Sequence, residues 1–320
     1  MTRIAILDDY QQVALSMAEW DSLRGCEVVS FSRPFSGPDP AAAALQGFDI
    51  VCLMRERTPF PRRLFEALPG LKCLVTSGLG NASVDLAAAR DCGVTVCHTR
   101  SGSTEHGTAE LAWGLILASA RNLVLEDRHV RQGRWQTSVG PMLHGKTLGL
   151  LGLGRLGARM AEIGRAFGMK TLAWSPNLDA QRAASHHADY VDKHDLFARS
   201  DVVSLHLVLS DRTRGIVGRQ ELARMQPHAV LVNTARAGLV DEAALIDALR
   251  DGTIAGAALD VFQQEPLPPE HPLLGMDRVI LSPHLGYVTR DTYRVFFTDM
   301  VEDIAAFLAG SPIRVLQAPA

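Results

Sequence analysis

The chain of 320 residues lacks the features that mark membrane, secreted and nucleic-acid-binding proteins. Its longest apolar segment, Leu111 to Ala120, falls well short of the roughly 20 residues that a bilayer-spanning helix needs. The N-terminal segment MTRIAILDDY has only a short apolar stretch before two aspartates, which argues against a secretory signal. A formal net charge of −3 leaves no basic surplus, so neither nucleic acid nor an anionic membrane is expected as a partner.

The cysteines and histidines also lack the spacings of disulfide frameworks and metal sites. The five cysteines include no CxxC pair, and Cys52 and Cys73 lie in apolar runs typical of buried strands, where a thiol acts as a small hydrophobic group. A reduced, cytoplasmic protein is therefore expected. No HExxH is present, and the adjacent His186 and His187 point in different directions in a helix or strand, so no metal site is expected.

The length and the alternation of elements predict an α/β protein of about two domains. Short apolar runs such as RIAIL, DIVCLM and LKCLV fill the first hundred residues, with a helical stretch around Val13 to Leu23. From about Ser103 to Gln132 the pattern is helical, with a broad apolar face. A second series of strand-like and helix-like segments follows, and a final helical stretch spans Thr289 to Leu308.

The most informative segment begins with an apolar run of strand length, Thr147 to Leu151, followed by Gly152, Gly154 and Gly157 in GxGxxG spacing. A helix-forming segment comes next. In such a motif the first glycine makes a tight turn, the second lets the backbone approach a pyrophosphate, and the third allows close helix–strand packing. The N–H groups at the start of the helix attract phosphate. The segment therefore predicts a dinucleotide site rather than an ordinary glycine-rich turn.

Three further motifs follow predicted strands in order: NTARAG with Arg236, LDVF with Glu265 just beyond, and SPHLG with His284. Each polar side chain lies at or past the C-terminal end of an apolar strand, where ligands bind in open α/β sheets. Taken singly, each could be a surface or capping residue. Their order and combination favour a catalytic site.

This series resembles the D-isomer-specific 2-hydroxyacid dehydrogenases, a family that includes D-3-phosphoglycerate dehydrogenases and glyoxylate/hydroxypyruvate reductases. The resemblance covers essentially the whole chain, from the LKCLVTSGLGNASVD segment to the final helices. It implies two doubly wound parallel-sheet domains, with a Rossmann nucleotide domain (residues 101–285) inserted into a flavodoxin-like substrate domain (residues 1–100 and 286–320). The chain would cross between them near Cys97–Ser103 and His284–Tyr287, and the terminal helix would return to the first domain.

By this resemblance, the chain is an NAD(P)-dependent oxidoreductase that interconverts a small 2-keto acid and the D-2-hydroxy acid by hydride transfer. Arg236 is expected to bind the substrate carboxylate and to polarise its carbonyl. His284 would act as the general acid and base, and a neighbouring Glu265 would favour the imidazolium form. NAD is the expected cofactor.

The glycine loop and the resemblance together also assign binding residues. The loop after the strand LKCLV would offer backbone N–H groups to the substrate carboxylate. Arg55 and Arg57, which follow the strand DIVCLM, could lie in the cleft or be solvated surface charges. His206 matches a family position near the cofactor and is expected to be structural. The cofactor-binding residues are Gly152, Gly154, Arg155, Leu156, Gly157, Ser175, Thr108, Leu207, Thr234, Ala235, Asp260 and Gly286. The substrate-binding residues are Arg55, Ser77, Gly78, Leu79, Gly80 and Tyr287, with Trp135 a further candidate for shaping the pocket.

One departure from the family pattern concerns the cofactor. NAD-dependent members have an aspartate at the tip of the second nucleotide-domain strand, where this chain has Ser175. Asp179 could replace it only if the loop folds back, and the nearest basic residue is Arg182. Losing the acid removes the repulsion of a 2′-phosphate, so NADP is the alternative cofactor. Ala237 and Val208, which replace the more usual glycine and proline, remove no functional group.

Two other functions compete with this one. A nucleotide-sensing scaffold resembling the corepressors built on this fold is the alternative, although no partner-binding appendage is evident. A short-chain dehydrogenase or epimerase needs Tyr-x-x-x-Lys, and none of the four tyrosines has a lysine four residues on. The resemblance further implies a homodimer joined through the nucleotide domain, helped by the helical segment near residues 104–132.

Overall fold

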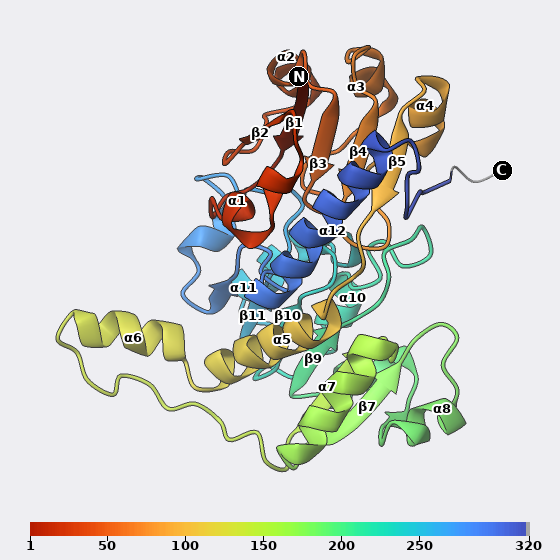
Figure 1. The fold of residues 1–320 in the computed structure, drawn as a ribbon. Helices are drawn as coiled ribbons and strands as arrows, with labels where there is room; N and C mark the ends of the chain where they lie inside the picture. Colours follow the sequence, from red (N-terminus) through yellow and green to blue (C-terminus); the bar gives the residue numbers. More distant parts are fainter. Residues whose placement is uncertain (318–320) are drawn as a thin grey trace. The chain divides into compact units, whose positions relative to one another are not determined.

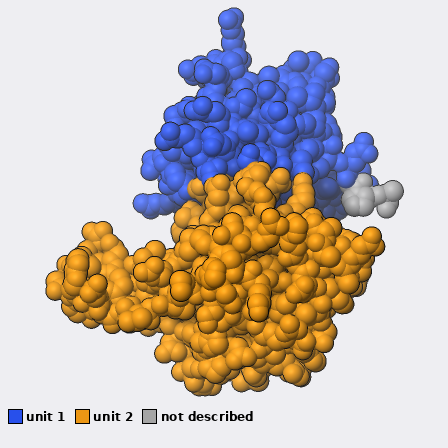
Figure 2. Space-filling view, turned by 90° about the horizontal axis from the view of Figure 1, so that it is seen from below, with its two compact units in different colours: residues 1–103, 289–320 blue, residues 104–288 orange. Residues whose placement is uncertain are grey.

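The structure is a computed structural model that describes residues 1–317. The chain divides into two compact units (Figure 2): unit 1 contains residues 1–103 and the C-terminal segment from Thr289, and unit 2 contains residues 104–288. The boundaries between the units thus fall at Ser103/Thr104 and Val288/Thr289. In residues 1–317, no helix has both the length and the apolar character needed to cross a bilayer.

The described part of unit 1 is a parallel sheet with helices on both faces (Figure 1), and its strand order is β2-β1-β3-β4-β5. The strands are β1 (Thr2–Ile6), β2 (Cys26–Ser30), β3 (Ile50–Leu53), β4 (Cys73–Thr76) and β5 (Thr95–His98). The helices are α1 (Ala14–Met17), α2 (Pro38–Leu45), α3 (Arg62–Glu66), α4 (Leu86–Asp91) and α12 (Arg290–Leu308), with a 3-10 turn η1 (Trp20–Ser22). This order is the flavodoxin-like order, as predicted.

The core of unit 1 explains why its central strands read as continuous apolar runs. Every residue of β3 and β4 is buried, because helices cover both faces of the sheet. Side chains of α2, α3 and α4 form the core on one face, while α12 packs against β4, β5 and α1. On the inner side of α12, the carboxylate of Asp299 bonds to Arg100 at 2.6 Å and that of Asp303 to Arg314 at 2.8 Å.

Unit 2 is a second parallel sheet, with strand order β12-β11-β10-β9-β6-β7-β8 (Figure 1). Its strands are β6 (Thr147–Leu151), β7 (Lys170–Trp174), β8 (Asp189–Tyr190), β9 (Val202–Leu205), β10 (Val230–Asn233), β11 (Gly256–Leu259) and β12 (Val279–Leu281). Its helices are α5 (Thr104–Ala120), α6 (Leu123–Arg131), α7 (Arg155–Ala166), α8 (Ala180–Ser185), α9 (Lys193–Arg199), α10 (Arg219–Leu222) and α11 (Glu242–Arg250), with 3-10 turns η2 (Ala237–Leu239) and η3 (Pro272–Gly275). Counted from β6, the first six strands have the Rossmann order, and β12 adds an edge strand.

Alternate residues of the strands of unit 2 supply two separate cores. Leu150 belongs to the core under α5 and α7, whereas the next residue, Leu151, belongs to the core under α9, α10 and α11. Successive side chains of a strand point to opposite faces, so one apolar run serves both layers. The predicted fold class, two parallel-sheet α/β domains of these two types, is confirmed.

Two predicted helical stretches differ from the observed elements. The stretch Val13 to Leu23 contains only the short α1 and η1, because the chain becomes extended at Ala18 and turns the Trp20 indole inward, where it donates to the Ala14 carbonyl and packs on Phe297. The stretch Ser103 to Gln132 divides into α5 and α6 at Asn122, whose φ of 51° is left-handed. Asparagine tolerates this conformation better than most residues.

Candidate active site

The glycine loop joins β6 to α7 in unit 2, and the absence of a side chain has a different physical role at each of its three glycines. Gly152 has a φ of 112°, and a Cβ there would lie 2.7 Å from the His206 carbonyl carbon. A Cβ on Gly157 would lie 2.1 Å from the Gly152 carbonyl oxygen, so no larger residue fits without moving α7. A Cβ on Gly154 would meet nothing within 4 Å. Gly154 therefore leaves open a space beside the start of α7, where N–H groups lack helical partners.

A pocket of about 370 Å³ opens beside this loop. We call it the glycine-loop pocket; it is lined by Gly152, Leu153, Gly154, Ser175, Pro176, Asn177, Arg182, His206, Leu207, Val208, Ser210, Arg212 and Thr213. It contains four of the predicted cofactor residues, Gly152, Gly154, Ser175 and Leu207. Arg155 and Leu156 form the first turn of α7, and the Arg155 guanidinium lies 3.6 Å from the Glu105 carboxylate. The open space at Gly154 and the free N–H groups fit the pyrophosphate of a dinucleotide.

The acid that an NAD ribose would need is missing from the described lining of this pocket. Ser175 follows β7 directly and lines the pocket, whereas Asp179 does not. The Asp179 carboxylate instead caps α8, accepting a 2.8 Å hydrogen bond from the backbone N–H of Arg182. The loop therefore does not fold back to place Asp179 at the strand tip.

His206 follows β9 and lines the same pocket. Its Nε2 is 2.9 Å from the Ser204 hydroxyl, and its buried Nδ1 has no hydrogen-bond partner in the described structure. Burial lowers the pKa of His206 to about 3, so that the ring is neutral at ordinary pH. His206 is therefore not the group that we expect to serve as an acid near pH 7.

Arg236 lies in a turn that follows β10 and is shaped by Asn233. The Asn233 side chain accepts from the Ala235 N–H at 3.0 Å and donates to the Arg236 carbonyl at 3.0 Å. The Arg236 guanidinium donates to the Ala235 carbonyl at 2.8 Å. The hydroxyl of Thr234 is buried without a hydrogen-bond partner among the described residues.

Asp260 follows β11 and organises the loop that carries His284. One carboxylate oxygen accepts from the Ser282 hydroxyl at 2.6 Å and from the Leu285 N–H at 2.7 Å, and the other accepts from the Gly286 N–H at 2.9 Å. The Asp260 side chain is buried, and this burial raises the pKa of the carboxyl despite its three donors. Thr108 of α5 holds the same loop through a 3.0 Å bond from its hydroxyl to the Gly286 carbonyl.

His284 and Glu265 are brought together by this loop. The His284 Nδ1 lies 2.7 Å from a Glu265 carboxylate oxygen, and the other oxygen of Glu265 accepts from the Phe262 N–H at 2.9 Å. The φ of His284 is 55°, a left-handed conformation that is uncommon for a non-glycine residue. The His284 ring meets the buried Tyr287 edge-on, with centroids 5.6 Å apart. Arg236, Glu265 and His284 thus follow three neighbouring strands at one edge of the sheet.

In unit 1, Arg55 and the loop after β4 come together at the C-terminal edge of the other sheet. The Arg55 N–H donates to the Ser77 hydroxyl at 2.9 Å, and its guanidinium donates to the Ser77 carbonyl at 3.3 Å. A Cβ on Gly78 would lie 1.8 Å from that guanidinium. Asn81 donates to the Arg55 carbonyl at 2.6 Å. Arg57 lies beside Tyr10, with its guanidinium 4.7 Å from the ring centroid.

Only part of the loop after β4 has free N–H groups. The N–H of Ser77 donates to the Leu53 carbonyl, and that of Gly78 donates to the Thr99 hydroxyl at 2.8 Å. Within the described part of the chain, the N–H groups of Leu79 and Gly80 make no hydrogen bond. Leu79 and Gly80 are therefore the positions of this loop that can donate to a substrate carboxylate.

Three residues that shape these sites are not predicted from the sequence. Asn233 and Ser282 lie inside recognised motifs, where their polar side chains next to strand ends could have indicated a supporting role. Arg212 lines the glycine-loop pocket from the segment after β9. Nothing in its local sequence indicates this position, because it depends on the pairing of β9 with β6.

Comparisons with known proteins agree with this architecture. A sequence model described as "D-isomer specific 2-hydroxyacid dehydrogenase, NAD binding domain" matches residues 113–286. The glyoxylate reductase of Aeropyrum pernix is 42% identical over 256 residues, 77% of this chain and 76% of that protein. The D-3-phosphoglycerate dehydrogenase of Methanocaldococcus jannaschii is 38% identical over 263 residues, 81% of this chain and 50% of that protein.

A crystal structure of a phosphoglycerate oxidoreductase from Vibrio cholerae has a TM-score of 0.92 and 38% identity, covering 97% of this chain and 100% of that one. The chain therefore belongs to the D-isomer-specific 2-hydroxyacid dehydrogenase family and is an enzyme. The segment 113–286 is a domain of the NAD-binding type, and it lies within unit 2.

Proposed function

We propose that this enzyme interconverts a small 2-keto acid and the D-2-hydroxy acid, with His284 as general acid and base. The observation that carries the proposal is the 2.7 Å pair of Glu265 and His284 at the strand ends of an NAD-binding domain. A bound nicotinamide would supply or accept the hydride. Gly152, Gly154, Gly157 and the first turn of α7 would hold the pyrophosphate.

The protein's part in the reaction is to move one proton and to stabilise charge. Because the His284 Nδ1 is engaged with Glu265, Nε2 is the ring nitrogen left to give a proton to the substrate oxygen during reduction. In the reverse direction the same nitrogen takes the hydroxyl proton. Glu265, anchored by the Phe262 N–H, fixes the orientation of the His284 ring through the bond to Nδ1.

Arg236 and the loop after β4 are the proposed substrate-binding groups. Arg236 would meet the carboxylate through its guanidinium and polarise the adjacent carbonyl. The free N–H groups of Leu79 and Gly80 would bind the carboxylate, with Arg55 held against this loop through its bonds to Ser77. The similarity to a glyoxylate reductase and a D-3-phosphoglycerate dehydrogenase favours a short substrate.

For the cofactor, we propose that NADP(H) is accepted alongside NAD(H). Ser175 occupies the strand-tip position, and the described lining of the glycine-loop pocket has no carboxylate that would repel a 2′-phosphate. A thousand-fold preference of kcat/KM for NADH over NADPH would contradict this proposal.

The test is a panel of keto acids assayed with NADH and NADPH by absorbance at saturating cofactor. Glyoxylate, hydroxypyruvate, pyruvate and a bulky aromatic keto acid span the plausible sizes. The variant His284→Ala should lower kcat by about 10²–10⁴-fold, the usual contribution of general acid–base catalysis, and should still bind cofactor. Near-native turnover by this variant would refute the role of His284. Tight cofactor binding by the wild type without turnover of any keto acid would favour a nucleotide-sensing scaffold.

We also propose a homodimer, formed through a projecting part of unit 2. In the described structure α6 has no buried residue, and α6 with the segment 132–146 projects from the rest of the unit (Figures 1 and 2). Val139 is 99% exposed and Trp135 is 75% exposed in this segment. Large apolar side chains on a projecting segment are typical of an interface.

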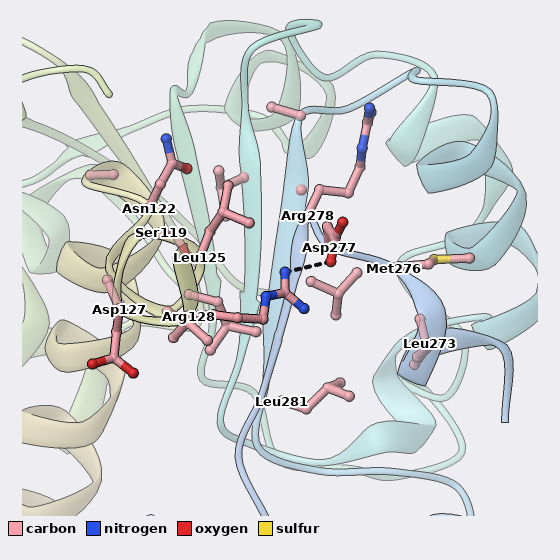
Figure 3. Close-up of a pocket in the computed structure, with 18 of the residues that line it drawn as sticks. Ser119, Asn122, Leu125, Asp127, Arg128, Leu273, Met276, Asp277, Arg278 and Leu281 are labelled. Atoms are coloured by element: carbon pink, nitrogen blue, oxygen red, sulfur yellow. Dashed lines mark hydrogen bonds and ion pairs between the residues drawn. The ribbon is translucent and has the colours of Figure 1, made fainter. Parts of the chain in front are cut away.

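A groove lies at the base of this projection, beside the edge strand β12, and it offers a place for a second copy to bind. Arg128 of α6 reaches across it to Asp277 at 2.6 Å, with Leu273, Met276 and Leu281 on the β12 side (Figure 3). Light scattering of Trp135→Asp should show a smaller particle than wild type. Leu15→Asp, which replaces an exposed apolar side chain of unit 1, should leave the particle size unchanged. A monomeric wild type at micromolar concentration would refute the dimer.

A cytoplasmic location is the remaining proposal. The five cysteines are all free thiols in the described structure, and Cys52, Cys73 and Cys97 are buried. Such thiols suit a reducing compartment. Fractionation of the cells that produce this protein, followed by immunodetection, tests the location.

A further inference from the structure

The lining of the glycine-loop pocket contains a second basic residue, Arg212, in addition to Arg182, which follows the tip of β7 in the sequence. Arg182 and Arg212 both line it, and they come from different segments, α8 and the loop after β9. Ser175 and Asn177 lie in the same lining and add a hydroxyl and an amide. Two guanidinium groups with neutral polar neighbours form a typical environment for a phosphate.

Neither arginine is neutralised by a carboxylate. Within residues 1–317, neither Arg182 nor Arg212 makes an ion pair. The Arg182 guanidinium donates to the Asn177 carbonyl at 3.1 Å, which holds it at the turn after β7. Asp179, the nearest acid to Arg182 in sequence, is used as the cap of α8. The positive charge of the pocket is therefore uncompensated.

The segment that carries Arg212 is held by its own hydrogen bonds. The Thr213 hydroxyl is buried and bonds to the Val208 carbonyl at 2.7 Å, and it accepts from the Ser210 N–H at 2.8 Å. Arg212 thus projects from an ordered turn beside Gly152 and His206, which line the same pocket. A preformed turn loses less conformational entropy when its side chain binds a ligand.

We propose that Arg182 and Arg212 together bind the 2′-phosphate of NADP(H), so that the enzyme prefers NADP(H) to NAD(H). This inference rests on the proposed dinucleotide site and goes beyond acceptance of both cofactors, because two unpaired guanidinium groups favour the phosphate actively. His206, neutral at ordinary pH, adds no charge to the pocket.

The test measures binding of the adenosine half alone by calorimetry. Wild type should bind 2′,5′-ADP about 10- to 100-fold more tightly than 5′-AMP, and added salt should reduce this difference, since exposed ion pairs are screened. Arg182→Ala and Arg212→Ala should each weaken binding of 2′,5′-ADP by about 3- to 30-fold and leave 5′-AMP unchanged. The double variant should lose the difference between the two nucleotides, and Arg182→Lys should keep part of it.

Arg165→Ala, which removes an exposed arginine of α7 outside the pocket lining, is the matched control and should bind both nucleotides like wild type. Equal binding of 2′,5′-ADP and 5′-AMP by wild type, with NADH still bound, would overturn the 2′-phosphate site alone. A preference that survives in the double variant would also overturn it. Failure of NADH, NADPH and both nucleotides to bind would overturn the dinucleotide site as well.

Discussion

Replacing Asp260 by asparagine tests how the loop that carries His284 is held in place. The carboxylate accepts from Ser282, Leu285 and Gly286. An asparagine can keep only one side-chain oxygen, so its amide nitrogen must face at least one of these donors. Each hydrogen bond to a charged group contributes about 1.5–3 kcal/mol, and a buried donor without an acceptor costs about 1–3 kcal/mol. We therefore expect Asp260→Asn to destabilise this loop by roughly 2–5 kcal/mol.

This loss is comparable with the strain that the loop must bear. The left-handed backbone of His284 costs about 1–3 kcal/mol, and the bonds from Asp260 to the two following N–H groups compensate for it. Once these bonds weaken, His284 can relax to a more common conformation and move away from Glu265. A displacement of about 1 Å at a reacting group can reduce a rate by about 100-fold. The expected result is a kcat roughly 30- to 100-fold below wild type.

The assay combines steady-state kinetics, thermal unfolding and binding of 5′-AMP, which involves the adenosine half of the cofactor only. Asp299→Asn is a matched control, because Asp299 is also fully buried and hydrogen-bonded, but it lies on α12 of unit 1. Both variants should unfold at lower temperature, and only Asp260→Asn should lose kcat. Binding of 5′-AMP should be native in both. Wild-type kcat in Asp260→Asn, or an equal loss in Asp299→Asn, would refute the positioning role.

Two further predictions concern cofactor binding and stability. Gly157→Ala would place a Cβ 2.1 Å from the Gly152 carbonyl oxygen, so α7 must shift. Fluorescence titration should show NADH binding weakened by about 10-fold or more. Unchanged binding would contradict the packing described. Burial raises the pKa of the Asp303 carboxyl to about 7, although Arg314 lies beside this carboxyl. The folded protein therefore holds this proton more tightly than the unfolded chain does. The resulting stabilisation is fully present below about pH 4 and is lost as the pH rises through 7. Asp303→Asn should therefore gain stability relative to wild type between pH 4 and pH 8, by up to about 4 kcal/mol in urea unfolding, whereas a pH-independent difference would count against the raised pKa.

The fold could be predicted from the sequence because its signals are local. Strands buried on both faces need continuous apolar runs, and runs such as LKCLV and AVLV are easy to recognise. The errors lie where a tertiary contact overrides local preference. Burial of the Trp20 indole against Phe297 breaks the first predicted helix after a single turn. The left-handed Asn122 divides the long one and starts the projection that we assign to a dimer interface.

The candidate site shows the same division between local and long-range information. The glycine spacing before α7 encodes much of its own geometry, because Gly157 avoids a clash with Gly152 five residues earlier and Gly152 avoids one with His206, which follows the adjacent strand β9. The hydrogen-bond partners of Asp260 lie 22 to 26 residues away, and only the folded sheet brings them to its carboxylate. Arg212 is a stronger case, since β9 must pair with β6 before its segment reaches the glycine loop. The proposed preference for NADP(H) therefore depends in part on a residue whose position follows from sheet topology, whereas the sequence near the strand tip after β7 offers only Arg182.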